Sequence, residues 1–235
     1  MREITHGDHL IQLERMRFSN CYLVREDDGL TLVDTSIPRS AGDILKAAGR
    51  VGGGPIRRIL ATHCHNDHVG SLDAVKERLP DAEVAMSARE AELMRGEVSR
   101  HPGEPEDGRL RGFVFHEQKT VPDRLLSDGD MVGSLRTVWA PGHTPGHLAF
   151  LDTRDGTLIA GDAYLSIGNV FVTSEVTLRF PLPALFGMWH AGTSNETARK
   201  LRALEPSRLA TGHGRVVEDP VPAMDHALAQ VGSAS

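Results

Sequence analysis

Several features that mark specialised classes of protein are missing from the sequence. There are 2 cysteines in 235 residues, too few for a disulfide scaffold, so we expect a reduced protein. The first ten residues, MREITHGDHL, lack the apolar run of a signal peptide. The most apolar long stretch, residues 164–192, contains Glu175, Arg179 and two prolines, so it does not fit a membrane span of about 20 apolar residues. These absences predict a cytoplasmic protein that does not associate with a membrane.

An excess of positive charge is also missing. The formal net charge is −6 at pH 7, so no basic field would draw the chain to nucleic acid or to anionic lipid. Hydrophobic residues make up 40% and charged residues 25%, as in an ordinary globular protein, and 235 residues fit a single domain over 1–235. We therefore expect a small-molecule substrate. A homodimer remains open. Five large apolar residues suit a dimer face, a substrate pocket or the core equally well: Phe171, Phe180, Phe186, Met188 and Trp189.

The apolar residues alternate between the spacing of strands and that of helices. We expect strands at 21–24, 30–33, 56–61, 82–86, 135–140, 147–151, 157–160 and 208–210, and helices at 40–51, 70–79, 87–95, 193–204 and 223–230. Ser87 with Glu90, and Thr193 with Glu196, predict capping boxes at two helix starts. Short hairpins and crossovers both occur, which predicts an α/β fold with two sheets. Residues 96–124, rich in Gly, Pro and charge, are either a surface insertion or a lid.

Histidine is abundant, with 12 residues, and it is the commonest metal ligand in proteins. Four candidate ligands fill six positions directly after a predicted buried strand: His63, His65, Asp67 and His68. A loop can turn all four side chains toward one point, which a strand or a helix could not. A random H-x-H-x-D-H pattern would occur on the order of once in several hundred such chains, so the pattern indicates a metal site without establishing one.

Three further candidates come from distant parts of the chain. His143, Asp162 and His213 each lie at the end of a predicted strand and beside a glycine. Glycine lets the backbone approach a buried ion closely, and loops at strand ends commonly carry functional residues. Ligand types in so many strand-end loops are hard to explain by packing alone.

The chemistry of this set of residues is coherent. Five imidazoles and two carboxylates suit zinc, although manganese and iron remain open. Two cations in one site need an anionic bridge, which an aspartate and a hydroxide can supply. Two ions about 3.5–4 Å apart lower the pKa of a bound water to near neutrality and polarise a substrate oxygen. We therefore expect two divalent metal ions and hydrolysis of an activated carbonyl by a metal-bound hydroxide, with Asp67 and Asp162 as catalytic residues.

The combination of motifs, from Asn20 to His213, resembles the metallo-β-lactamase superfamily. The resemblance implies an αβ/βα sandwich of two mixed sheets flanked by helices. It also implies that one metal is held by His63, His65 and His143, the other by Asp67, His68 and His213, and that Asp162 bridges the two. Asp34, in Leu32-Val33-Asp34-Thr35, matches the family's early aspartate that supports a ligand from behind, although aspartate also commonly ends a strand.

Departures from particular members of the family bear on the substrate. Asp162 stands where one group of β-lactamases has a cysteine ligand, and His65 where the oxygen-reducing di-iron members have glutamate. Only 22 residues (235 − 213) follow His213, too few for the glutathione-binding domain of glyoxalase II. Tyr164 lies near Asp162, as the lactonases' tyrosine does but at a different spacing, so it is a candidate for substrate binding.

The leading hypothesis is therefore hydrolysis of an ester, lactone or thioester of a small molecule. A second hypothesis is an oxidoreductase, a mononuclear iron dioxygenase acting on persulfides through His63, His65 or His143, and Asp162. A phosphodiester hydrolase and a non-catalytic metal-binding module also remain open. His147 is expected to meet the core or a hydrogen-bond partner rather than a metal, and Cys64, which alternation points away from the ligands, is expected to be a packed thiol.

Overall fold

The computed structural model describes residues 1–110, 118–175 and 187–231. The chain forms two compact units, which we describe separately. Unit 1 comprises Met1–Gly96 and Val114–Leu126, and unit 2 comprises Glu97–Phe113 and Ser127–Ser235. None of the helices in the described ranges is both long enough and apolar enough to cross a membrane.

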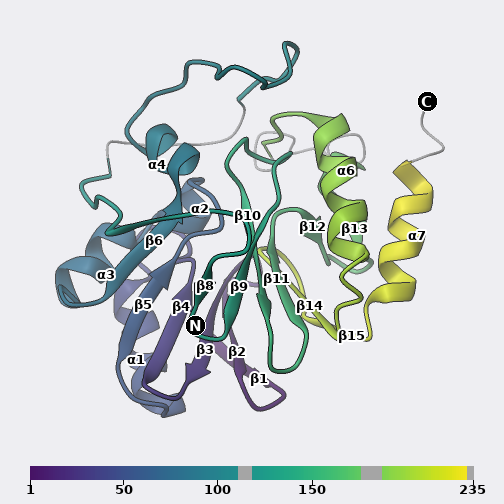
Figure 1. Ribbon diagram of the computed structural model, residues 1–235. Helices are drawn as coiled ribbons and strands as arrows, with labels where there is room; N and C mark the ends of the chain where they lie inside the picture. The colour runs from purple at the N-terminus through teal and green to yellow at the C-terminus, as the bar shows by residue number, and fades with distance from the viewer. Residues whose placement is uncertain (111–117, 176–186, 232–235) are drawn as a thin grey trace. The chain divides into compact units, whose positions relative to one another are not determined.

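Unit 1 is built on a seven-stranded sheet whose strand order follows the sequence (Figure 1). The strands are β1 (Arg2–His6), β2 (Leu10–Arg15), β3 (Ser19–Glu26), β4 (Gly29–Val33), β5 (Ile56–Leu60), β6 (Glu83–Ser87) and β7 (Arg124–Leu126). Pairing is antiparallel from β1 to β4 and parallel from β4 to β7. Because parallel strands end at the same edge of a sheet, the loops after β4 and β5 begin side by side.

In the described part of unit 1, four helices accompany this sheet: α1 (Ala41–Val51), α2 (Asn66–Val69), α3 (Leu72–Arg78) and α4 (Ala88–Met94). In α1, buried Ala41, Ile44 and Ala48 recur at helical spacing and face the sheet, and Gly52, with a φ of 71°, ends the helix. Buried side chains of α1, α3 and α4 form one core cluster with those of the strands. Burial of these apolar faces fixes the sheet that carries the first ligand loop.

Unit 2 is built on a six-stranded sheet in the order β15-β14-β11-β10-β9-β8. These strands are β8 (Met131–Val132), β9 (Leu135–Trp139), β10 (Leu148–Asp152), β11 (Thr157–Gly161), β14 (Arg208–Thr211) and β15 (Val217–Glu218). Only β11 and β14 pair in parallel among these described strands. The unit also contains a small hairpin, β12 (Tyr164–Leu165) with β13 (Phe171–Val172), and two neighbouring helices, α6 (Ala191–Arg202) and α7 (Val221–Val231) (Figure 1).

The fold class expected from the sequence is confirmed, since two mixed sheets with accompanying helices are present. The strands β1 and β2 were not predicted. Ser87 caps α4 as expected, because its side chain accepts a hydrogen bond from the backbone N–H of Glu90. The second predicted capping box is wrong: α6 begins at Ala191, and the cap is His190, whose ring accepts from the N–H of Thr193.

Candidate metal centre

The first group of candidate ligands lies in unit 1, in the loop and short helix α2 that follow β5. The Nε2 atom of His63 and the Nδ1 atom of His65 are 3.1 Å apart. The rings of His63 and His68 have centroids 4.0 Å apart, and the ligand atoms of Asp67 and His68 lie within 4.8 Å of each other. The three imidazoles are buried. The structure therefore brings the four residues of the H-x-H-x-D-H motif together, as the sequence predicts for this segment.

Asp34 supports this group from the neighbouring strand end. It directly follows β4, and its backbone N–H donates to the carbonyl of Leu60 at 2.8 Å. One carboxylate oxygen of Asp34 accepts from the N–H of Thr62, and the other contacts Nδ1 of His68, both at 2.8 Å. With a carboxylate on Nδ1, the His68 ring is held as the tautomer that leaves Nε2 as its electron-pair donor. The predicted contact between Asp34 and a candidate ligand is present.

The second group of candidate ligands lies in unit 2. His143 is in the turn between β9 and β10, and Asp162 and His213 follow β11 and β14. Since β11 and β14 are parallel neighbours, their ends share one edge of the sheet. One oxygen of Asp162 lies 3.2 Å from Nε2 of His213 and 3.5 Å from Nε2 of His143, and all three side chains are buried. Two imidazole nitrogens thus converge on one carboxylate oxygen.

The main chain of Asp162 is held on both sides by neighbouring side chains. Its N–H donates to Nε2 of His147 at 3.1 Å, and its carbonyl accepts a hydrogen bond from the hydroxyl of Thr173. The expectation that His147 meets a hydrogen-bond partner is confirmed. That the partner is the backbone of a candidate ligand was missed, as was Thr173, which no motif in the sequence marks.

The donor atoms of these groups fit metal ions. Two nitrogens, each about 2.1 Å from one zinc ion at the tetrahedral angle, would be about 3.4 Å apart. The 3.1 Å between His63 Nε2 and His65 Nδ1 is close to that value. Imidazole and carboxylate donors suit zinc, manganese and iron alike. The chain thus carries His and Asp residues able to hold metal, and their chemistry does not select one element.

Two further residues singled out in the sequence are core residues. Tyr164 has no exposed surface, and its hydroxyl donates to the carbonyl of Ala198 at 2.7 Å. Burial also raises the pKa of this phenol. This placement does not favour the predicted contact with substrate. Cys64 is the buried thiol that we expected, and burial raises its pKa well above the usual value.

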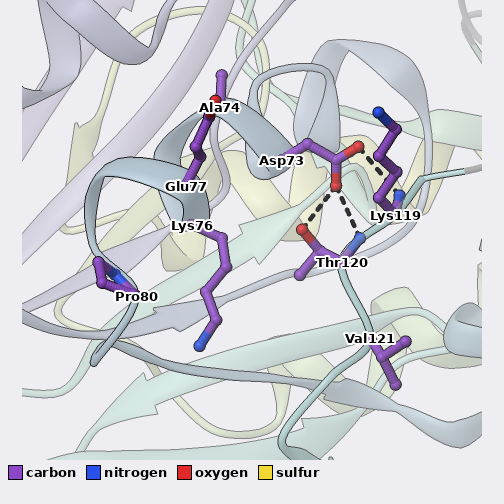
Figure 2. Close-up of a pocket in the computed structure, with 8 residues that line it drawn as sticks. All are labelled: Asp73, Ala74, Lys76, Glu77, Pro80, Lys119, Thr120 and Val121. Carbon is purple, nitrogen blue, oxygen red and sulfur yellow. Dashed lines mark hydrogen bonds between the residues drawn. The ribbon is translucent and has the colours of Figure 1, made fainter.

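One cavity of about 660 Å³ lies in unit 1 between α3 and residues 119–121 (Figure 2). It is lined by Asp73, Ala74, Lys76, Glu77, Pro80, Lys119, Thr120 and Val121, none of which is a predicted ligand. Residues 119–121 belong to the segment predicted as an insertion or lid, and here they lie against α3. Residues 111–117 of this segment lie outside the described residues, as do residues 176–186 of the apolar stretch 164–192.

Asp73 ties this segment to α3. Its carboxylate accepts from the N–H groups of Lys119 and Thr120 and from the Thr120 hydroxyl, at 3.0, 2.8 and 2.6 Å (Figure 2). Burial alone would raise the pKa of Asp73, but the hydrogen bonds from Thr120 and Lys119 outweigh it, and the pKa lies below its usual value.

We expect Asp73→Ala to lower the free energy of unfolding by about 1–2 kcal/mol at pH 7, because the hydrogen bonds from Lys119 and Thr120 are lost. The loss is no larger because Asp73 is only half-buried, so that water can partly replace these bonds. A carboxyl with a lowered folded-state pKa contributes stability above its unfolded pKa, and this is lost as the pH falls through the folded pKa. The difference should therefore begin to shrink as the pH falls below about 4, the usual pKa of aspartate, and should shrink further as the pH falls through the lower folded-state pKa. Urea unfolding at pH 7 and pH 3 measures it. Glu77→Ala, an exposed acid on the same cavity, should change little, and equal effects of the two variants would contradict the role of Asp73.

The chain is similar to known proteins over most of its length. The model of the Metallo-beta-lactamase superfamily matches residues 15–213. The protein YobT of Bacillus subtilis (strain 168) is 42% identical over 209 residues, 89% of this chain and 88% of its own. A hydroxyacylglutathione hydrolase of Xanthomonas axonopodis pv. citri (strain 306) is 32% identical over 146 residues, 62% of this chain and 46% of that enzyme.

A solved structure gives the same result for the fold. The protein TTHA1623, in a di-iron-bound form, superposes with a TM-score of 0.63 at 25% identity, covering 95% of this chain and 97% of that one. The family match spans far more than half of the sequence, and it contains all seven candidate ligands. The chain therefore belongs to the metallo-β-lactamase superfamily.

Proposed function

We propose that the protein is a metal-dependent hydrolase that cleaves an ester, lactone or thioester bond of a small molecule. The observation that supports it most is the pair of imidazole nitrogens converging on one oxygen of Asp162, at 3.2 and 3.5 Å. A buried carboxylate between two ligand-type imidazoles could supply the anionic bridge that a site for two cations needs. Family membership supports the same conclusion, and under this proposal the two units act as the single domain expected from the sequence.

In the proposed function, the seven candidate ligands would hold two metal ions. His63, His65 and His143 would hold one ion, Asp67, His68 and His213 would hold the other, and Asp162 would bridge them. The ions, when bound, would lower the pKa of a water molecule and polarise the substrate carbonyl. Asp34 would keep His68 in the tautomer that offers Nε2, and Asp162 would offset the repulsion of the two cations. Asp67 would accept a hydrogen bond from the attacking water.

Two arguments support this class of bond. Ester, lactone and thioester carbonyls are activated, so polarisation and a nucleophilic water suffice for their cleavage. Similarity to a hydroxyacylglutathione hydrolase favours a thioester among them, although the matched part covers 46% of that enzyme. Zinc, manganese and iron all suit the ligands, and we propose zinc, as expected from the sequence. The di-iron form of TTHA1623 supports iron as the alternative.

We expect the purified protein to contain about two metal ions per chain and to hydrolyse at least one member of a panel of a lactone, an aryl ester and an acylated thiol. Removal of the metal with a chelator should abolish the activity, and zinc, manganese or iron added back separately should identify the working metal. Full hydrolysis by metal-free protein would contradict the proposal. Oxygen uptake with a thiol persulfide, without hydrolysis of the panel, would replace it with the dioxygenase hypothesis.

A further inference from the structure

We propose that Glu90 is a positioning residue for the proposed metal site and acts on it through the backbone of Cys64. Glu90 lies in the first turn of α4 and has no exposed surface. Its Oε2 atom accepts a hydrogen bond from the N–H of Cys64 at 2.8 Å. Cys64 is the residue between His63 and His65, so this bond holds the chain between two candidate ligands.

Glu90 contacts the side chain of Cys64 as well as its backbone. The pKa of the thiol is raised by burial, by the neighbouring charge of Glu90 and by a hydrogen bond to Glu90. The Cys64 side chain belongs to the core cluster of unit 1. Alternate residues of an extended segment point to opposite sides, so a Cys64 held toward the core directs His63 and His65 together to the other side. The distance of 3.1 Å between Nε2 of His63 and Nδ1 of His65 agrees with this common direction.

A second carboxylate holds the same loop two residues earlier. Asp34 accepts from the N–H of Thr62 at 2.8 Å, and Glu90 accepts from the N–H of Cys64 at the same distance. Two buried acids, one just after β4 and the other in α4, thus accept hydrogen bonds from the amides on either side of His63. Both hydrogen bonds are charge-assisted, which makes them roughly twice as strong as neutral ones. Asp34 also contacts the candidate ligand His68 directly, whereas Glu90 acts through the residue between two ligands.

The position of Glu90 is itself fixed by the start of its helix. Its N–H donates to the hydroxyl of Ser87 at 3.1 Å. This N-cap hydrogen bond fixes the backbone of Glu90, from which its side chain extends toward Cys64. Burial of a carboxylate costs free energy unless the carboxylate is hydrogen-bonded, and the same holds for a backbone N–H. The bond between Glu90 and the Cys64 N–H satisfies both buried groups. Replacing Glu90 with alanine would leave the Cys64 N–H without this acceptor.

The inference rests on the proposed function, and metal affinity is its first test. We expect Glu90→Ala to weaken the binding of zinc by about 10–100-fold, the range seen when a residue behind a metal ligand is removed. Glu90→Gln keeps an oxygen that can accept the bond but loses the charge, so we expect a smaller loss, of about 3–10-fold. Titration of the metal-free full-length protein with zinc against a chromophoric chelator measures both values.

A second measurement does not depend on the metal. In metal-free protein, hydrogen exchange of a peptide covering residues 61–69 should be faster in both variants than in the wild type, because the Cys64 amide loses its charged acceptor. Glu92→Ala, on the same helix, is the matched control, since the carboxylate of Glu92 pairs with Arg89 at 3.3 Å. It should leave both zinc affinity and exchange unchanged.

The outcomes separate the two proposals. Wild-type protein that binds no metal would end the proposed function, and the exchange experiment would still decide whether Glu90 holds the loop. Wild-type zinc affinity in Glu90→Ala, even with a lowered melting temperature, would show a purely structural role and overturn the inference. If Glu90→Ala does not fold, Glu90→Gln takes its place, and a variant identical to wild type in both measurements overturns the inference in the same way.

Discussion

Replacing Asp162 with asparagine is expected to reduce hydrolysis by about a hundredfold to a thousandfold and to release at least one of the two proposed metal ions. The substitution keeps the shape of the side chain but removes the negative charge 3.2 Å from Nε2 of His213 and 3.5 Å from Nε2 of His143. Loss of one preorganised electrostatic contact in an active site commonly costs this much in rate. Elemental analysis and initial rates with the best substrate of the panel measure the two effects.

The fold should survive this change because neighbouring side chains hold the main chain of Asp162. The N–H of Asp162 donates to His147 and its carbonyl accepts from Thr173, and neither bond uses the carboxylate. Asp152→Asn is the matched control, since Asp152 is also buried in unit 2 but pairs with Arg154 at 2.6 Å. The control should lower stability and leave metal content intact. Retention of both metal ions and full turnover in Asp162→Asn would rule out the bridging role.

The positions of the candidate ligands could be predicted because the information is local. Each ligand lies where a strand ends, so an apolar run followed by glycine, histidine or aspartate marks it without any knowledge of tertiary contacts. The contact of Asp34 with His68 could be anticipated for a related reason. Their strands β4 and β5 are parallel neighbours, and side chains that follow such strands begin at the same edge of the sheet.

The contacts that hold the ligands could not be predicted in the same way. Glu90 reaches the N–H of Cys64 across 26 positions of sequence, and His147 reaches that of Asp162 across 15. Such bonds depend on how a helix or strand packs on its sheet, and any buried polar group nearby could have made them. Tyr164 shows the opposite error: it is close to Asp162 in sequence, but it lies in β12, with its hydroxyl bonded to a carbonyl of α6.

The start of α6 was predicted wrongly and the strands β1 and β2 were missed, for different reasons. Thr193 and Glu196 have the spacing of a capping box, but the ring of His190 takes the N–H of Thr193, and histidine is not among the preferred cap residues. β1 and β2 carry polar residues at many positions, and their pairing with each other and with β3 defines them. Strand propensity depends on such neighbours, so a single sequence indicates these elements weakly.

Gly142→Ala is expected to lower the free energy of unfolding by about 2–6 kcal/mol, the sum of backbone strain and of overpacking. Gly142, next to His143, has a φ of 139°, which side chains rarely adopt. A Cβ atom there would lie 2.3 Å from Cα and 2.5 Å from the backbone nitrogen of Ser194 in α6. Because the obstacle is helix backbone, the loop or the helix must move. Urea unfolding of the metal-free protein gives the change in stability.

The contact between Gly142 and α6 holds the turn in place, which is why we expect a large loss in the free energy of unfolding. The carbonyl of Gly142 accepts from the N–H groups of Trp189 and His190 at 3.2 and 3.0 Å, so the turn that carries His143 is anchored on the two residues just before α6. Gly129→Ala separates the two contributions, since Gly129 also has a positive φ, 88°, but its Cβ would meet nothing within 4 Å. It should cost only the backbone strain, about 1–3 kcal/mol. If Gly142→Ala costs no more than Gly129→Ala, contact with α6 does not constrain the turn, and the placement of His143 beside Asp162 needs another explanation.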